Sequence, residues 1–296
     1  MRVLISGATG LVGTELKRQL LASGHTPISL VRGREAGANE IRWNPSAGEL
    51  PLGSLEDIDA VVNLGGATTG KIPWTKAYKQ EIIASRLDST RTLVQAINAA
   101  KNPPKVLVSG SASGFYGDSG DAILTEDSPK GVGFLADLAA QWEVEARKAK
   151  TRVVLVRTTM VMSRKLGALG RLLPLLRLGV GGALGNGRQW WAWISLPDEA
   201  RAIIHLINHS DAAGAYNLTA PEPATCGQIV KSLARQRHRP AFLNVPAFAL
   251  RLLLGEAAVE LLLCSQNMSA KRLLATGFEF EHPTLESATA WVVGRD

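Results

Sequence analysis

Short apolar runs alternate with longer amphipathic stretches through the first half of the chain. The amphipathic stretches repeat their apolar residues every three to four positions, which predicts helices over residues 11–24, 76–100 and 135–149. The apolar runs are rich in Val, Ile and Leu, as strands buried on both faces are; they cover residues 1–6, 26–32, 59–66, 105–110 and 151–158. This alternation predicts an α/β fold built on a Rossmann-type, doubly wound parallel sheet, which binds its ligand at the carboxyl ends of the strands.

The rhythm loosens after residue 160. Segment 163–192 is rich in glycine and leucine and contains an aromatic pair, which predicts a loop-and-helix cover over a site. A short strand is expected over 214–220, and most of the chain beyond it is expected to be helical. We therefore expect a nucleotide-binding domain over residues 1–160, to which 191–218 returns, and a smaller, mostly helical substrate-covering domain over 161–296.

The bulk composition is that of an ordinary globular protein. The chain has 296 residues, of which 46% are hydrophobic and 20% charged, enough for one large domain or two smaller ones. It has no run of the ~18 to 20 apolar residues that a membrane helix needs, and its first residues lack the features of a signal peptide. Its two cysteines, Cys226 and Cys264, are too few for a disulfide framework or a zinc site. We therefore expect a cytoplasmic protein without a membrane or metal partner, monomeric or homodimeric.

The net charge of +7 suits anionic ligands. The basic residues are scattered along the chain, however, and the densest cluster is the short RQRHR stretch at 235–239. A nucleic-acid-binding protein is expected to gather its basic residues on one face. We therefore expect a small-molecule substrate and no nucleic acid.

The first predicted strand runs directly into GATGLVG at residues 7–13. Three glycines at this spacing allow a tight turn, a close approach of the backbone to a pyrophosphate and close packing of helix on strand. A glycine-rich structural turn is the alternative, but the position between a strand and a helix favours dinucleotide binding. The cofactor contacts predicted here are Gly7, Thr9, Gly10, Leu11, Val12 and Gly13.

The end of the second predicted strand distinguishes between the two nicotinamide cofactors. An acidic residue there would bind the ribose 2′-hydroxyl of NAD(H), whereas this chain has Val31 followed by Arg32. An arginine pairs well with a 2′-phosphate, which favours NADP(H) over NAD(H), although Arg32 could instead stack near the adenine. After the third strand, the small residues near Leu64, Gly65 and Gly66 would let the backbone approach the adenosine and the diphosphate.

These elements together resemble an extended short-chain dehydrogenase/reductase. GATGLVG, NLGGA (63–67) and VSGSASGFYG (108–117) follow one another in that family's order. More specifically, the chain resembles the YfcH-type epimerase subgroup of the NAD-dependent epimerase/dehydratase family, and the similarity runs the whole length. The marks of that subgroup are KIPW (71–74), Glu81 with Ser85-Arg86, TEDSP (125–129), Trp142-Glu143, RLGVGGALGNGRQWWAWI (177–194) and a terminal GFEF with PTLESA.

The resemblance implies a Rossmann domain with a small carboxyl-terminal domain and an NADP(H) cofactor. It also implies that Glu81, Arg86, Ser109 and Val161 line the cofactor. From the residues alone, Glu81 and Arg86 could equally form a solvated pair on a helix. The implied activity is hydride transfer, as a reductase or a nucleotide-sugar epimerase-like enzyme.

Short-chain dehydrogenases generally use a tyrosine as acid/base with a lysine one helical turn later, because the cation lowers the phenol pKa from ~10. No tyrosine of this chain has such a lysine, and Gly133 and Asp137 stand at the expected positions. The remaining catalytic candidates are Ser111 or Ser113, which resemble the family's substrate-binding serine, and Tyr116. Tyr116 could be a proton donor, a substrate contact or a structural residue. The nearby Asp118 and Asp121 would raise its pKa if they lay close.

The predicted cover supplies the substrate candidates Arg188, Trp190 and Trp191, while Trp193 is more consistent with core. Arg157 ends the fifth strand and would either contact substrate or satisfy a buried carboxylate. Because the Tyr/Lys pair is absent, two functions stay open. One is an NADP(H)-dependent oxidoreductase or epimerase-like enzyme, and the other is an NADP(H)-binding sensor or regulatory protein without turnover.

Overall fold

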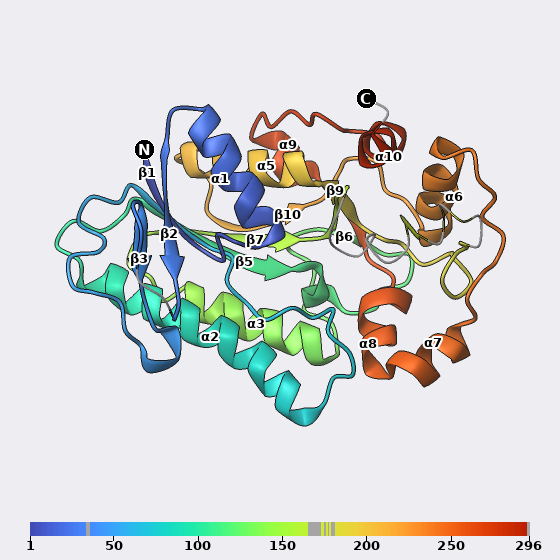
Figure 1. The fold of residues 1–296 in the computed structure, drawn as a ribbon, viewed down its shortest axis with the longest axis horizontal. Helices are drawn as coiled ribbons and strands as arrows, with labels where there is room; N and C mark the ends of the chain where they lie inside the picture. The colour runs from blue at the N-terminus through green and yellow to red at the C-terminus, as the bar shows by residue number, and fades with distance from the viewer. Residues whose placement is uncertain (34–35, 165–172, 175, 177, 179–180, 295–296) are drawn as a thin grey trace.

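The fold is described from a computed structural model that covers residues 1–33, 36–164, 173–174, 176, 178 and 181–294. Its centre is a seven-stranded parallel sheet with the strand order β10-β7-β5-β4-β1-β2-β3 (Figure 1). The strands are β1 Arg2–Ser6, β2 Thr26–Val31, β3 Glu40–Arg42, β4 Ala60–Asn63, β5 Val106–Ala112, β7 Arg152–Thr158 and β10 Gly214–Leu218. The predicted doubly wound parallel sheet is confirmed.

Helices cover both faces of this sheet. Helices α1 (Leu11–Ala22) and α5 (Leu196–Asn208) lie on one face, and α2 (Lys76–Ala99) and α3 (Phe134–Ala146) lie on the other (Figure 1). Alternate residues of each strand serve the two faces, because side chains alternate with a period of two. Thus Val3, Val62 and Val108 pack towards α1 and α5, whereas Leu4, Val61 and Leu107 pack towards α2.

The edge strand β3 is absent from the sequence-based prediction. It has three residues, Glu-Ile-Arg, and they are only partly buried or exposed. A short, polar edge strand has no apolar run to reveal it, and its charged residues suit an unpaired sheet edge. Its pairing with β2 sets its register, with Leu30 opposite Ile41.

The chain after β7 returns to the sheet before it forms the carboxyl-terminal part. Strand β8 (Met160–Met162) pairs with β9 (Trp193–Ser195), α5 follows directly, and β10 joins the main sheet beside β7. Within the predicted cover over 163–192, residues 165–172, 175, 177 and 179–180 lie outside the described residues. No helix of the described part is long and apolar enough to cross a membrane.

The carboxyl-terminal part is mostly helical, as expected. Helix α6 (Cys226–Gln236) packs on α10 (Leu285–Val293), and the short strand β11 (Asn267–Met268) pairs with β6 (Ile123–Leu124). The remaining elements are η1 Pro45–Ala47, η2 Ser113–Tyr116, α7 Ala247–Leu254, α8 Glu256–Ala258, the π-helical turn η3 Val259–Leu263 and α9 Lys271–Ala275.

Candidate active site

The turn after β1 leaves no space for side chains at two of its glycines. Gly7 has a φ of 71°, and a Cβ atom there would lie 2.7 Å from the carbonyl oxygen of Leu64. A Cβ atom on Gly13 would lie 2.3 Å from the carbonyl oxygen of Gly7. The turn, the end of β4 and the first turn of α1 are therefore in backbone contact, which is the geometry that a dinucleotide-binding turn requires.

The amino terminus of α1 is available to an anion. Helix α1 begins at Leu11, its capping residue is Gly10, and no side chain caps it; no acidic residue stands in its first turn. The first N–H groups of a helix lack intrahelical acceptors and carry a partial positive charge. A pyrophosphate fits here, and Thr9 and Gly10 are exposed beside it.

A buried polar network holds the ends of β1 and β4 together. The Ser6 hydroxyl donates to Asn63 Oδ1 (2.5 Å) and accepts from the N–H of Gly65 (3.1 Å). Asn63 Nδ2 donates to Thr90 Oγ1 (2.8 Å), which also accepts from Trp142 Nε1 (2.8 Å). The turn containing Leu64, Gly65 and Gly66 is thereby fixed against α2 and α3.

Arg86 lies over this turn. Its Nη1 donates to the carbonyl oxygens of Ala67 (3.0 Å) and Ile82 (3.1 Å), and a Cβ atom on Gly66 would lie 2.9 Å from its Cζ. Burial lowers the pKa of Arg86 to about 10, so it stays charged at neutral pH. No carboxylate of the described residues forms an ion pair with Arg86, and Glu81 is exposed. The predicted solvated Glu81–Arg86 pair is therefore not formed.

The remaining predicted cofactor residues occupy three neighbouring strand ends. Val31 is buried at the end of β2, and Arg32 is exposed directly after it. Ser109 is buried in β5, where its hydroxyl donates to the Gly110 carbonyl oxygen (3.3 Å). Val161 is partly buried in β8 and packs against the core cluster that contains Ala8.

A second polar network fills the space between β5, β7 and α3. The Ser111 hydroxyl donates to Glu143 Oε1 (2.7 Å), and Glu143 is 4% exposed. Arg157 donates to both oxygens of that carboxylate, from Nε (2.8 Å) and Nη2 (3.0 Å). Gly110 makes room for the neighbouring Trp142, whose ring would lie 2.7 Å from a Cβ atom there.

Arg157 satisfies a buried carboxylate and does not face substrate. Besides Glu143, its Nη1 donates to the Tyr116 hydroxyl (2.8 Å) and to the Glu126 carbonyl oxygen (3.1 Å). Its guanidinium lies over the Phe115 ring, 3.6 Å from the centroid, and the residue is 3% exposed. The structural alternative is therefore the one that the geometry supports, since these contacts leave the guanidinium no open face.

Tyr116 is a structural residue in this arrangement. It is 1% exposed, and its hydroxyl lies within hydrogen-bonding distance of Asn217 Oδ1 (2.7 Å) and the Thr125 carbonyl oxygen (3.0 Å). Burial raises the pKa of Tyr116, and Arg157 partly opposes the rise. The expected contribution of Asp118 and Asp121 is replaced by burial and Glu126.

Those two aspartates bind elsewhere. Asp118 accepts a hydrogen bond from the Ser265 N–H (3.0 Å), and Asp121 accepts one from Trp190 Nε1 (2.8 Å). Both contacts join the loop after β5 to the later part of the chain. The aspartates therefore hold the cover instead of tuning the tyrosine.

Ser113 is the serine with an open hydroxyl. It is the first residue of η2, directly after β5, and it is partly exposed. Its hydroxyl has no hydrogen-bond partner within the described part of the chain. Ser111, by contrast, donates its hydrogen bond to Glu143, so Ser113 is the serine of the two whose hydroxyl is available to another molecule.

The expected positions of the missing Tyr/Lys pair are occupied by other interactions. Gly133 precedes α3, and the N–H groups of Phe134 and Leu135 each donate to the Glu260 carboxylate (both 2.7 Å). Asp137 forms an exposed ion pair with Lys130 (2.6 Å). The helix start that would carry a catalytic phenol is thus capped by a carboxylate from the carboxyl-terminal part.

The cover residues are partly engaged. Trp191 Nε1 donates to the Leu262 carbonyl oxygen (3.1 Å). Trp193 is fully buried, as expected, in a hydrophobic cluster with residues of α6 and α10. Arg188 is exposed, and the one hydrogen bond it makes within the described residues is from its backbone N–H to Asn186 Oδ1 (2.9 Å). Arg188 and the edge of Trp190 therefore remain the open substrate candidates in this segment.

The sequence gives no direct signal for Glu199. It is fully buried in the first turn of α5, where its Oε1 accepts a hydrogen bond from Thr158 Oγ1 (2.6 Å). It shares its side of the helix with the apolar Ile203 and Leu206, four and seven positions later. A carboxylate in the apolar stripe of a helix is the pattern that would have identified it.

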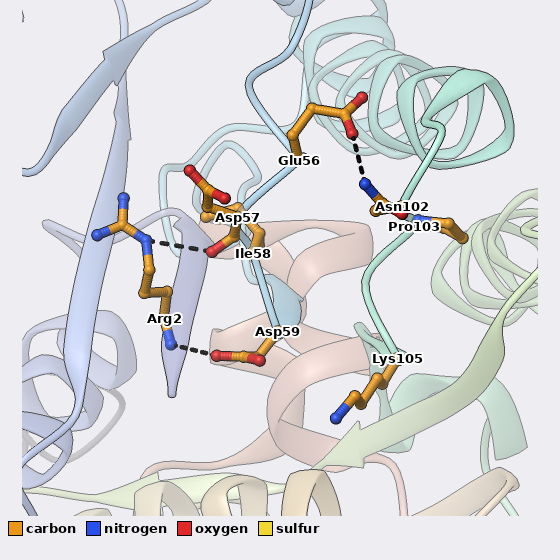
Figure 2. Close-up of a pocket in the computed structure, with 8 residues that line it drawn as sticks. All are labelled: Arg2, Glu56, Asp57, Ile58, Asp59, Asn102, Pro103 and Lys105. Carbon is orange, nitrogen blue, oxygen red and sulfur yellow. Dashed lines mark hydrogen bonds between the residues drawn. The ribbon is translucent and has the colours of Figure 1, made fainter.

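One hollow of the described surface lies away from these residues. It has a volume of about 550 Å³ and is bordered by Arg2, the first residue of β1, and by Asp59 and Lys105, which precede β4 and β5 (Figure 2). It is therefore at the amino ends of the strands, opposite the glycine turn. Its walls are held by local bonds, such as that from the Arg2 N–H to Asp59 Oδ2 (2.7 Å), and no group of metal-binding side chains is found among the described residues.

The parallel sheet, the glycine turn and the open amino terminus of α1 define a dinucleotide-binding protein of the short-chain dehydrogenase/reductase class. Residues 3–219 match the NAD dependent epimerase/dehydratase family, and the chain belongs to that family. Residues 245–292 match a domain of unknown function, DUF1731. The family resemblance drawn from the sequence motifs is confirmed.

Three similar proteins extend over nearly the whole chain. An epimerase family protein of Mycobacterium leprae is 39% identical over 296 residues, covering 99% of this chain and 96% of that protein. The crystal structure of the human epimerase family protein SDR39U1 (isoform 2) with NADPH matches with a TM-score of 0.92 and 33% identity, covering 99% of both chains. The nucleoside-diphosphate sugar epimerase from Corynebacterium glutamicum matches with a TM-score of 0.80 and 28% identity, covering 99% of this chain and 58% of that chain.

Proposed function

We propose that the protein is an NADP(H)-dependent enzyme that transfers hydride to or from a small molecule, as a reductase or a nucleotide-sugar epimerase-like enzyme. The observation that carries the proposal is a row of backbone and side-chain groups, at the carboxyl ends of neighbouring strands, that are accessible to a ligand. The uncapped terminus of α1 is followed by the Leu64–Gly66 turn under Arg86, and then by the partly exposed Ser113.

The cofactor assignment rests on charge. The α1 terminus and the glycine turn would hold the diphosphate, and Arg32 would pair with the 2′-phosphate of NADP(H). Arg86 adds a second cation without a carboxylate partner in the described residues. The human relative crystallised with NADPH supports the same choice. NAD(H) is the less favoured cofactor because no acid follows β2.

The bound cofactor would supply the hydride donor or acceptor. The chain's own contribution is to hold the substrate oxygen at Ser113 and to keep the strand ends rigid. Ser111, Glu143 and Arg157 form a closed network that prevents β5 and β7 from moving apart. Since no phenol is open at this place in the described residues, the substrate proton would exchange with water beside Ser113.

The substrate class follows from the cover and from one relative. Arg188 is exposed and suits an anionic group, and the Trp190 ring suits a planar one. The relative called a nucleoside-diphosphate sugar epimerase supports a nucleotide sugar. On this assignment residues 1–160 with 191–218 bind the cofactor, and the rest of 161–296 covers the substrate.

A cytosolic location is part of the same proposal. Cys226 and Cys264 are both buried and unpaired, and burial raises the pKa of their thiols to about 11 and about 12. Inert, reduced cysteines of this kind suit a reducing compartment.

The alternative is an NADP(H)-binding sensor or regulatory protein without turnover. Two observations favour it over other rivals: Glu260 occupies the helix start where a catalytic tyrosine is expected, and Tyr116 is bound within the core. Such a protein would keep its cofactor affinity and lack hydride exchange.

Isotope exchange separates the two functions. NADPH labelled with deuterium at the transferable position would be incubated with a panel of carbonyl compounds, and NADP⁺ with nucleotide sugars that carry deuterium on the sugar ring, and transfer of the label would be read by mass spectrometry. Transfer that falls at least tenfold in Ser113→Ala and is retained in Ser119→Ala supports the enzyme. Tight NADPH binding without transfer to any member of the panel supports the sensor.

A further inference from the structure

Glu199 is a buried carboxyl group whose hydrogen bonding is incomplete. It is 0% exposed; Oε1 accepts a hydrogen bond from the Thr158 hydroxyl (2.6 Å), whereas Oε2 has no hydrogen-bond partner among the described residues. Burying a polar atom without a partner is unfavourable, because the atom loses its hydrogen bonds to water. An apolar residue would fit the stripe formed by Ile203 and Leu206, so packing does not account for the carboxyl group.

The position of Glu199 relates it to the proposed cofactor site. Its partner Thr158 ends β7 and lies opposite Ala112, the residue before Ser113, in the sheet register. The neighbouring Ala200 belongs to the core cluster against which Val12 and Val161 pack. The first turn of α5 therefore backs the wall that runs from the glycine turn to the end of β7. A dinucleotide that reaches from α1 to Ser113 would place its nicotinamide end along this wall.

Within the part of the chain that the structure describes, no charged group pairs with Glu199. Helix α5 packs on α1, β5, β7, β8 and β9, of which β5, β8 and β9 carry no charged residue. Arg157 on β7 is paired with Glu143, and Arg152 bonds to carbonyl oxygens at the far end of α5. The other titratable groups on these elements and on the segment bound to α5 are Glu15, Lys17, Arg18, Asp198, Arg201, His205, Glu281 and His282.

Most of these groups bind one another, and no hydrogen bond or ion pair within the described residues joins any of them to Glu199. Glu15 is paired with Arg18, and Asp198 accepts from Ser195 and from the N–H groups of Glu281 and His282. Burial accordingly raises the pKa of Glu199 to about 8, and the hydrogen bond from Thr158 only partly opposes it. The group is mostly uncharged at neutral pH.

We propose that Glu199 sets the relative affinity of the site for the oxidised and the reduced cofactor. The inference rests on the proposed NADP(H) site and adds a role for a residue behind it. The nicotinamide ring is cationic in NADP⁺ and neutral in NADPH, while every other part of the two molecules is the same. A Glu199 carboxylate attracts the cationic ring through a medium of low dielectric, and the protonated acid does not.

The sign of the effect follows from linkage. Binding of NADP⁺ favours release of the Glu199 proton, so NADP⁺ affinity rises with pH until the unliganded carboxyl is ionised. NADPH binding has no such dependence on Glu199. Because the 2′-phosphate and its partner Arg32 are common to both complexes, their titration cancels in the ratio of the two dissociation constants.

The experiment measures Kd for NADP⁺ and for NADPH by calorimetry between pH 6 and pH 9, with no substrate present. In the wild type, the ratio Kd(NADP⁺)/Kd(NADPH) is expected to fall severalfold per pH unit up to about pH 8, with tenfold as the upper limit. Glu199→Gln keeps the shape, carries no charge and should give a flat ratio. Glu15→Gln, which removes a carboxylate of α1 that is paired with Arg18, should keep the wild-type slope.

A second variant guards against failure of the first to fold. Thr158→Val removes the one hydrogen bond that the described residues make to the Glu199 carboxyl and should move the slope to higher pH. A flat ratio in the wild type, a slope that survives in Glu199→Gln, or no binding of either cofactor would overturn the inference. The hydride-exchange assay is independent of this result: a pH-dependent ratio without exchange would refute turnover and leave the role of Glu199 intact.

Discussion

Two regions lie at the same end of the parallel sheet: the carboxyl ends of β1 and β4, and the carboxyl ends of β5 and β7. They are built differently. At β1 and β4 the backbone forms the site: Gly7 and Gly13 allow the turn after β1, the end of β4 and the start of α1 to come into contact. No side chain caps the amino terminus of α1. At β5 and β7 side chains fill the space, as Arg157 joins Glu143 and Tyr116 in a closed network. The first region is shaped to receive a ligand, and the second is shaped to hold its own strands in place.

The most severe way to break the second region is to remove one partner of its ion pair. Arg157→Met leaves the buried Glu143 carboxylate with the longer contact to the half-exposed Arg147 (3.7 Å) as its remaining ion pair among the described residues, and we expect the free energy of unfolding to fall by about 3 kcal/mol. Urea denaturation measures it. The double variant with Glu143→Leu should recover a large part of the loss, and a double variant no more stable than Arg157→Met would show that the pair is not the origin of the effect.

In the first region, a substitution that displaces the backbone should weaken cofactor binding. Gly13→Ala places a Cβ atom 2.3 Å from the Gly7 carbonyl oxygen, so the turn must move, at a stability loss of about 2 kcal/mol. NADPH binding, followed by fluorescence, should weaken at least tenfold. Gly70→Ala is the matched control, because the nearest atom to its Cβ would lie at 3.5 Å. Unchanged affinity in Gly13→Ala would contradict the assignment of the turn.

A smaller change, at the end of the neighbouring strand β2, should lower cofactor affinity without lowering stability. Arg32→Ala removes an exposed cation, and we expect NADPH to bind about tenfold more weakly, or about 1.5 kcal/mol, for the loss of a hydrogen bond to a charged group. NADH affinity and the free energy of unfolding should stay constant. If NADH weakens equally, Arg32 stacks on the adenine instead of binding the 2′-phosphate.

The buried Glu199, which is bonded to Thr158 at the end of β7, should make the free energy of unfolding depend on pH. The Glu199 pKa is raised in the folded state from 4.5 to about 8, so the folded protein retains a proton that the unfolded chain has lost. The stabilisation is complete below pH 4.5 and is lost as the pH rises to about 8, with a slope of at most about 1.4 kcal/mol per pH unit. Denaturation of Glu199→Gln should lack this component; an identical slope in the variant would refute the burial argument.

The sequence was informative where structure is local. The succession of strands and helices along the chain and the glycine turn follow from residues that are close together in the sequence. It was less informative where partners are distant: Tyr116 binds Asn217, which is 101 positions away, and Phe134 binds Glu260, which is 126 positions away. A pattern of neighbours cannot indicate such contacts, so the sequence left the role of Tyr116 open and gave no signal for Glu260.

Arg157 illustrates the same limit within a correctly predicted strand. Its place at the end of β7 was predicted, but substrate contact and a buried ion pair were equally compatible with it. The choice depended on Glu143, which stands on helix α3, 14 positions earlier. Burial, which the sequence does not give for a single charged residue, decides between the two.

The Glu260 carboxylate at the start of α3 has a consequence for how the chain is inherited. The helix belongs to the part that matches the epimerase/dehydratase family, and the carboxylate that caps it belongs to the part that matches DUF1731. A gene that lost the second segment would encode a first segment with an incomplete helix start. Exchange of the carboxyl-terminal module between relatives would therefore succeed only where the incoming module presents an acid at the same point, which ties the descent of the two modules together.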